Sequence, residues 1–95
     1  MALAGFVVAI AAGVEGVVPG TAVVAANSAP CGECPYCLRG SPSLCDDLLF
    51  WNGAYAEFAR IPARVVRKNL LRLDDGLEFR EAAMVEPLAC VVRGV

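Results

Sequence analysis

Four cysteines within a short segment constrain this chain more than any other feature. The segment PCGECPYCLRGSPSLC places them at Cys31, Cys34, Cys37 and Cys45, with two-residue gaps between the first three. Zn²⁺ favours four soft or borderline ligands in a tetrahedron, and a two-residue gap lets neighbouring thiolates face one ion. Four sulfur ligands leave no position for water. The spacing therefore predicts a structural zinc site, which stabilises a fold and performs no catalysis.

Two other assignments of these cysteines are open, namely two disulfides in a secreted scaffold or an iron–sulfur cluster. Five cysteines is an odd count for a disulfide framework, and the start MAL lacks the basic segment of a secretory signal. The last gap is seven residues long, unlike the three-residue gap of the bacterial cluster motif. We therefore favour zinc in a cytoplasmic protein. Turn-forming residues punctuate the segment, as wrapping an ion requires: Gly32, Pro35, Gly40 and Pro42.

Composition sets the wider limits. Ninety-five residues predict one domain with a modest core. Hydrophobic residues make up 58% of the chain, more than one small core covers, so we expect an interface with a second copy or with the remainder of a larger protein. The net charge of −2 disfavours nucleic-acid binding. Glu15, Pro19 and Gly20 interrupt the N-terminal apolar stretch, so no membrane span of about 20 residues is expected.

The N-terminal stretch predicts two strands, at residues 6–10 and 21–25, around a glycine-rich turn. Both runs are apolar on each face, which indicates a closed or doubly covered sheet. Residues 53–68 predict a further strand, a corner at Pro62 and a second short strand at Val65 and Val66. Four basic residues there are expected at a solvated strand edge that discourages pairing: Arg60, Arg64, Arg67 and Lys68.

The C-terminal part predicts helices. The Asp-Asp-Gly sequence at residues 74–76 indicates a turn, a helix is expected from Phe79, and Pro87 fits the first position of a second helix. Trp51, with Phe50 and Tyr55, is expected to form an apolar cluster that seals the cysteine segment onto the sheet.

Together, PCGECPYC, the loop to Cys45, GAYAEFARIPA and LDDGLEFREAAMVEPLACVVRGV resemble the zinc-dependent medium-chain alcohol dehydrogenases, especially the polyol, sorbitol and threonine dehydrogenase branch. The resemblance implies a mainly β fold with short helices, comprising a partial GroES-like β-barrel, a zinc lobe and a C-terminal helix. It assigns residues 1–95 to a partial catalytic domain, with the lobe at 28–48 and the C-terminal helical segment at 78–95. It also implies that the four clustered cysteines are the ligands of the structural zinc.

The resemblance further implies a catalytic zinc held by a cysteine, by the histidine of a Gly-His-Glu motif and by the glutamate of Glu-Pro-Leu. Glu86 precedes Pro87 and Leu88, but the chain has no histidine. Glu86 alone cannot hold a catalytic zinc, which needs about three protein ligands. A competing structural role places Glu86 at a helix N-terminus, where the dipole favours negative charge. Cys90, four residues later on the same helical face, is expected to be a small buried core residue.

Two functions are compatible with these features. The first is a truncated catalytic-domain segment of a zinc-dependent NAD(P) alcohol or polyol dehydrogenase, which binds structural zinc and is inactive alone. No glycine fingerprint of a coenzyme domain follows a strand, so NAD(P) would be bound only by a full-length relative. The second is a small zinc-binding module for self-association or for docking to a partner enzyme.

Overall fold

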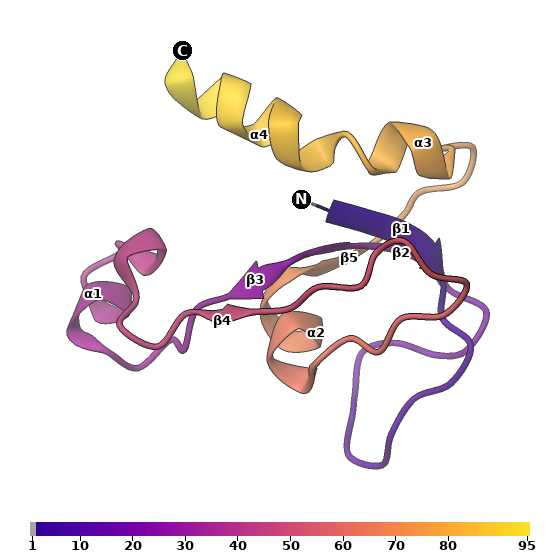
Figure 1. Cartoon of the computed structure of the whole chain (residues 1–95), viewed down its shortest axis with the longest axis horizontal. Helices are drawn as coiled ribbons and strands as arrows, with labels where there is room; N and C mark the ends of the chain where they lie inside the picture. Colours follow the sequence, from indigo (N-terminus) through magenta and orange to yellow (C-terminus); the bar gives the residue numbers. More distant parts are fainter. Residues whose placement is uncertain (1) are drawn as a thin grey trace.

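The computed structural model describes residues 2–95, which form two small antiparallel sheets and several short helices (Figure 1). Strands β1 (Ala2–Phe6), β2 (Ala22–Ala26) and β5 (Leu70–Arg72) form one sheet, in the order β1-β2-β5. Strands β3 (Ser28–Ala29) and β4 (Leu49–Phe50) form the second. The helices are α1 (Pro35–Leu38), a 3-10 helix (Pro42–Leu44), α2 (Ala63–Asn69), α3 (Phe79–Ala82) and α4 (Val85–Gly94).

The central strand β2 is covered on both faces. Val23, Val24 and Ala25 are all buried, and side chains of consecutive strand residues point to opposite faces. In the ladder, Ala25 lies opposite Leu3 of β1 and Leu70 of β5. The doubly covered strand predicted at residues 21–25 is therefore confirmed, displaced by one residue.

One cluster forms the core. Ala25, Ala29, Trp51 and Val65 are buried together, with Leu3, Ile61 and Leu70 packed against them. The Trp51 indole Nε1 donates a hydrogen bond to the Ala26 carbonyl at 2.9 Å, which satisfies its polar atom. Trp51 is the residue after β4, and its hydrogen bond therefore links the end of β4 to the end of β2.

The aromatic cluster predicted around Trp51 is only partly present. Trp51 belongs to the core, but Phe50 is 63% exposed and Tyr55 is fully exposed. Phe50 pairs with Ser28 at the end of a two-strand ladder, so its side chain has no third strand to pack against within the described residues. The prediction was wrong for these two rings because Phe50 lies in a ladder only two residues long, and Tyr55 lies beyond it, in neither described sheet.

The first predicted strand is displaced. The ladder with β2 uses residues 2–6, and residues 7–10 lie in the loop before β2. The Val7 N–H donates to the Thr21 carbonyl at 2.9 Å, so Val7 follows the last paired residue of the ladder. The apolar run continues beyond the strand, and its composition alone could not mark where pairing ends.

Residues 53–68 do not form the two predicted strands. Residues 54–60 belong to neither described sheet, and Val65 and Val66 lie in helix α2. The weak β preference of valine was overridden because Val65 fills the core from a helix. Arg64, Arg67 and Lys68 therefore lie on a helix and not at a strand edge.

The C-terminal predictions are largely confirmed. The Leu77 N–H donates to the Asp74 carbonyl across the predicted turn, and α3 begins at Phe79. Helix α4 begins at Val85, two residues before the predicted start, so Pro87 lies in its first turn. Phe79 and Phe6 meet edge to face, with ring centroids 4.9 Å apart, which attaches α3 to β1.

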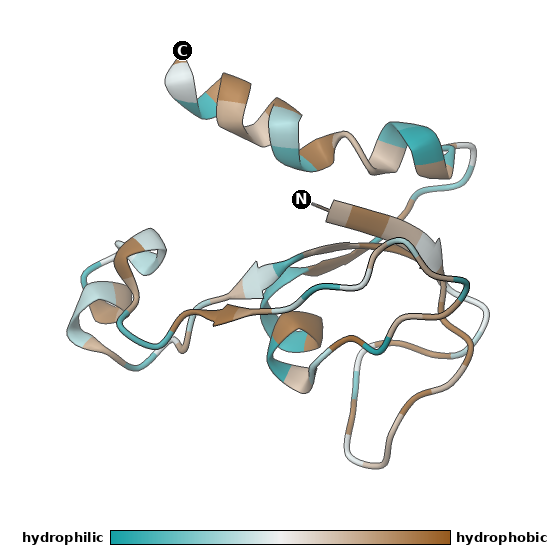
Figure 2. Ribbon diagram, viewed as in Figure 1, coloured by the Kyte–Doolittle hydropathy of each residue, from teal (hydrophilic) through white to brown (hydrophobic). Residues whose placement is uncertain are grey.

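The architecture is a mixture of strands and short helices, and the expectation of a mainly β fold is corrected accordingly. The described strands form sheets of three and two strands, and a barrel is not detected among them. Figure 2 shows apolar segments along α4 and in the loop between β1 and β2, outside the core. No helix within residues 2–95 has the length and apolar character needed to cross a membrane.

Replacing Val65, the one large and fully buried side chain within residues 2–95, tests this core. Val65→Ala should lower the free energy of unfolding by about 1–2 kcal/mol, since it removes two buried methyl groups and leaves a cavity. Urea unfolding followed by the fluorescence of Trp51, the single tryptophan, measures the change. Val91→Ala is the matched control because Val91 is 64% exposed on α4. Equal losses in both variants would contradict the assigned core.

Candidate metal centre

The short β3–β4 ladder brings together the two ends of the cysteine segment. Ala29 pairs with Leu49, so the intervening residues 30–48 form an excursion from the second sheet. The excursion contains α1 and the 3-10 helix, and it projects from the rest of the molecule in Figure 1. We call residues 28–48 the lobe. Its closed ends place Cys31 and Cys45 side by side, although they are distant in sequence.

The four cysteine sulfurs converge. Their Sγ atoms all lie within 4.8 Å of one another, and those of Cys31 and Cys37 are 3.9 Å apart. A tetrahedron with Zn–S bonds of ~2.3 Å has sulfurs about 3.8 Å apart. Cys34 is buried, the other three are partly buried, and all four are free thiols. Within residues 2–95 this is the one group of three or more His, Cys, Asp or Glu side chains that could hold a metal ion.

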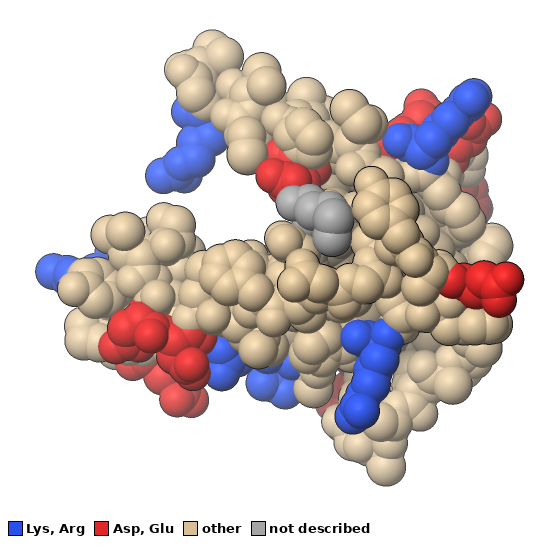
Figure 3. Space-filling model, viewed as in Figure 1, with Lys and Arg blue, Asp and Glu red and all other residues tan. Residues whose placement is uncertain are grey.

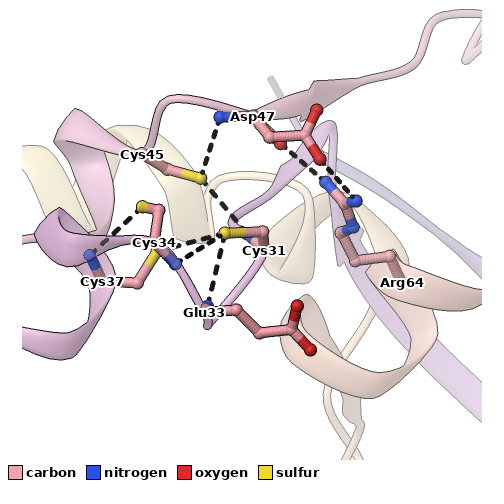
Figure 4. A network of polar contacts seen from close by, with 7 residues as sticks. All are labelled: Cys31, Glu33, Cys34, Cys37, Cys45, Asp47 and Arg64. Carbon is pink, nitrogen blue, oxygen red and sulfur yellow. Dashed lines mark hydrogen bonds and ion pairs between the residues drawn. The ribbon is translucent and has the colours of Figure 1, made fainter.

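Backbone N–H groups point at three of the sulfurs (Figure 4). Cys31 Sγ accepts hydrogen bonds from the Glu33 and Cys34 N–H groups, each at 3.3 Å. Cys45 Sγ accepts from the Cys31 N–H at 3.3 Å and from the Asp47 N–H at 3.4 Å. These donors stabilise negative charge on sulfur, as groups that hydrogen-bond to metal ligands commonly do.

Gly32 makes the first of these turns possible. Its φ of +81° lies in the left-handed region, which residues other than glycine rarely adopt. The turn directs the next two N–H groups back to Cys31 Sγ. The glycine after the first cysteine is therefore a geometric requirement of the cluster.

The sulfur environments separate the pKa values of two thiols. The Cys37 N–H, donating to Cys34 Sγ, is the main cause that lowers the pKa of Cys34 from 9.0 to about 7. Desolvation, with smaller contributions from the neighbouring sulfurs, raises the pKa of Cys37 to about 12. Four thiolates this close repel one another, and a divalent cation offsets that repulsion and favours the deprotonated form of its ligands. The donor set, its spacing and its N–H contacts fit a tetrathiolate-bound Zn²⁺.

Arg64 of α2 reaches the lobe, a contact that was not predicted from the sequence. Its guanidinium donates to the Asp47 carbonyl at 2.7 Å and to Asp47 Oδ2 at 3.1 Å. The contact was missed because Val65 and Val66 were interpreted as a short strand, with Arg64 at its solvated edge. The basic residues at positions 64 and 68, four apart after Pro62, were the signal that could have indicated a helix face.

Glu86 lies apart from this cluster, in the first turn of α4. That position agrees with the helix-terminus role considered from sequence. Cys90 is exposed, and its Sγ donates to Glu86 Oε1 at 3.8 Å, so the expected burial of Cys90 was wrong. The apolar residues of α4 nearby are themselves exposed, and the helix offers Cys90 no core within the described residues.

Comparison with known proteins identifies relatives. Residues 1–71 match the family model of the alcohol dehydrogenase GroES-like domain. The chain is 38% identical over 96 residues to D-altritol 5-dehydrogenase of Agrobacterium fabrum, covering 97% of this chain and 27% of that protein. It is 35% identical over 92 residues to an uncharacterized zinc-type alcohol dehydrogenase-like protein of Escherichia coli, covering 90% of this chain and 25% of that protein.

A solved structure agrees with these matches. The crystal structure of galactitol-1-phosphate dehydrogenase from Escherichia coli is similar with a TM-score of 0.81 and 30% identity, covering 94% of this chain and 26% of that one. The chain therefore spans about a quarter of the length of these relatives.

Proposed function

Because the chain belongs to the zinc-type medium-chain alcohol and polyol dehydrogenase family, through its GroES-like domain, we propose that it is a catalytic-domain segment whose lobe holds a structural Zn²⁺. The convergence of four free thiols within 4.8 Å carries this proposal. Cys31, Cys34, Cys37 and Cys45 would be the ligands. When bound, the ion would cross-link the lobe and contribute its binding free energy to folding.

The rest of the dehydrogenase is part of the same proposal. The sheet of β1, β2 and β5 would be a portion of a GroES-like barrel, since β1 and β5 are both edge strands that further strands could extend. A coenzyme domain would supply NAD(P) binding in a full-length, cytoplasmic enzyme. The names of the relatives point to an alcohol or polyol substrate.

Glu86 would contribute to a catalytic zinc only within such an enzyme. The Glu-Pro-Leu sequence places its partly exposed carboxylate in the first turn of α4. A catalytic zinc needs about three protein ligands and an open position, and residues 2–95 supply no second cluster that could complete the set. We therefore propose that the chain alone does not catalyse hydride transfer.

Exposed apolar surface favours a second candidate, a zinc-binding interaction or oligomerisation module. Phe6 is 65% exposed and Phe58 is 74% exposed, and both line a largely apolar pocket of about 600 Å³ between β1 and residues 54–63. Isolated apolar side chains are ordinary at protein surfaces, but a contiguous lining of this kind marks a contact site. The same surface would accept either a second copy or the remainder of a dehydrogenase.

Metal analysis tests the proposed zinc site. We expect one zinc per chain, lost in Cys37→Ser, because three thiolates no longer close the tetrahedron and the lobe unfolds. Cys90→Ser is the matched control, since Cys90 lies outside the cluster and should leave the zinc content unchanged. Iron with visible charge-transfer absorption, or two internal disulfides by mass spectrometry, would show that the assignment is wrong.

Sedimentation tests self-association. We expect dimers or larger species at micromolar concentration, and Phe58→Glu should shift them toward monomer by placing a charge in the apolar pocket. Leu38→Glu is the control, because Leu38 is equally exposed, at 74%, but lies in α1 of the lobe. A compact monomer for the unmodified chain, or dissociation by Leu38→Glu alone, would contradict this surface.

Enzyme assays test the absence of independent catalysis. The zinc-loaded chain should show no oxidation of polyols, threonine or simple alcohols with NAD or NADP. Holding the coenzyme against the substrate can supply roughly 7–11 kcal/mol, and Lewis-acid polarisation several more, and the described residues provide for neither. Turnover that Glu86→Ala abolishes would overturn this expectation and would require a site assembled between chains.

A further inference from the structure

Helix α2 presents two cations to the lobe. Arg64 and Lys68 are four residues apart and therefore share one face of the helix. Figure 3 shows basic and acidic side chains meeting where the lobe joins the rest of the molecule. The two cations meet different parts of the lobe, one beside Cys45 and the other beside Cys31.

Arg64 holds Asp47, whose N–H donates to the Sγ of Cys45, the fourth cysteine of the cluster. Its guanidinium donates to both the carbonyl and the carboxylate of Asp47, at 2.7 and 3.1 Å (Figure 4). The N–H of the same Asp47 donates to Cys45 Sγ at 3.4 Å. The Arg64 side chain is only 25% exposed, whereas that of Asp47 is 73% exposed. The more buried Arg64 side chain thus restrains the exposed turn at Asp47. Two hydrogen bonds from one planar guanidinium fix the orientation of that turn.

Lys68 lies against the turn at the first sulfur. A Cβ added to Gly32 would stand 2.8 Å from Lys68 Nζ, so the ammonium group lies next to the backbone between Cys31 and Glu33. A Zn²⁺ bound by four thiolates carries a net charge of −2. Lys68 places a positive charge beside the turn of Cys31, whereas the charge of Arg64 is paired with the Asp47 carboxylate, so Arg64 acts on the centre through the turn that it holds.

We propose that Arg64 is a positioning residue of the metal centre, which holds the turn at residues 45–47 so that the Asp47 N–H stays directed at Cys45 Sγ. Lys68 assists as a point charge at the turn of Cys31. The proposal rests on the proposed zinc-binding function. It adds a contact through which helix α2 holds the turn at Cys45, the fourth ligand. Removing Arg64 should weaken zinc binding although every ligand remains.

Zinc competition against a chromophoric chelator tests this, using the full chain. Arg64→Met should raise the zinc Kd about tenfold, the lower end of the effect of removing a group that orients a metal ligand. Arg64→Lys keeps the charge but loses the planar pair of donors, so it should recover only part of the affinity. Arg67→Met is the matched control: it makes the same charge change on the same helix, and Arg67 makes no ion pair with the described lobe residues. Equal losses in Arg64→Met and Arg67→Met, or no loss in either, would overturn the proposal.

Amide hydrogen exchange separates positioning from general destabilisation. In zinc-loaded Arg64→Met, exchange should accelerate at the Asp47 N–H while the Cys37 N–H, which bonds to Cys34 Sγ, stays protected. Equal acceleration at both would overturn the proposal.

If Arg64→Met does not fold, Asp47→Ala serves instead. It removes one of the two acceptors and should raise the zinc Kd less than tenfold, and an unchanged Kd would count against the proposal. Failure of the unmodified chain to bind zinc would refute the proposed function itself.

Discussion

Much of the structure depends on the packing of Val65 between the central strand and Trp51. This contact joins three pieces of chain that are remote in sequence, because Ala25 lies in β2, Val65 in α2 and Trp51 just after β4. Two members of the cluster, Ala25 and Ala29, are small, so the core is built around the two larger side chains of Val65 and Trp51. This contact holds helix α2 in place, and Arg64, the residue before Val65 on the same helix, reaches the lobe from that position.

Electrostatic interactions decide the stability of the lobe, whereas apolar packing decides the stability of the core. Four sulfurs approach within 4.8 Å, and only a compensating charge makes that arrangement favourable once the thiols ionise. Backbone N–H groups offset part of that charge, and in our proposal Arg64 and Lys68 of α2 act on the turns that carry those groups. Such a site is sensitive to groups that are not ligands, because each contributes to the same electrostatic balance. The family relationship and the local geometry are both consistent with a structural zinc site.

The sequence was sufficient for features that depend on local chemistry. Cysteine spacing predicts the cluster, glycine predicts the turn at residue 32, and apolar β-branched composition predicts β2. It failed where tertiary contacts decide. Val65 and Val66 prefer strands intrinsically, yet the core accepts Val65 from a helix, and this reversal moved Arg64 from a supposed strand edge to the lobe. The exposed positions of Phe50, Tyr55 and Cys90 likewise reflect missing neighbours within the described residues, which composition does not encode.

The two-residue ladder between β3 and β4 has a consequence for the order of folding. Pairing Ala29 with Leu49 requires residues 30–48 to return to their starting point, and the entropy lost in closing such a loop grows with its length. A cross-link between Cys31 and Cys45 would leave only a few residues on each side to close. A metal captured early by the unfolded chain would therefore make the second sheet a local structure with low contact order, and β4 would deliver Trp51 to the core sooner.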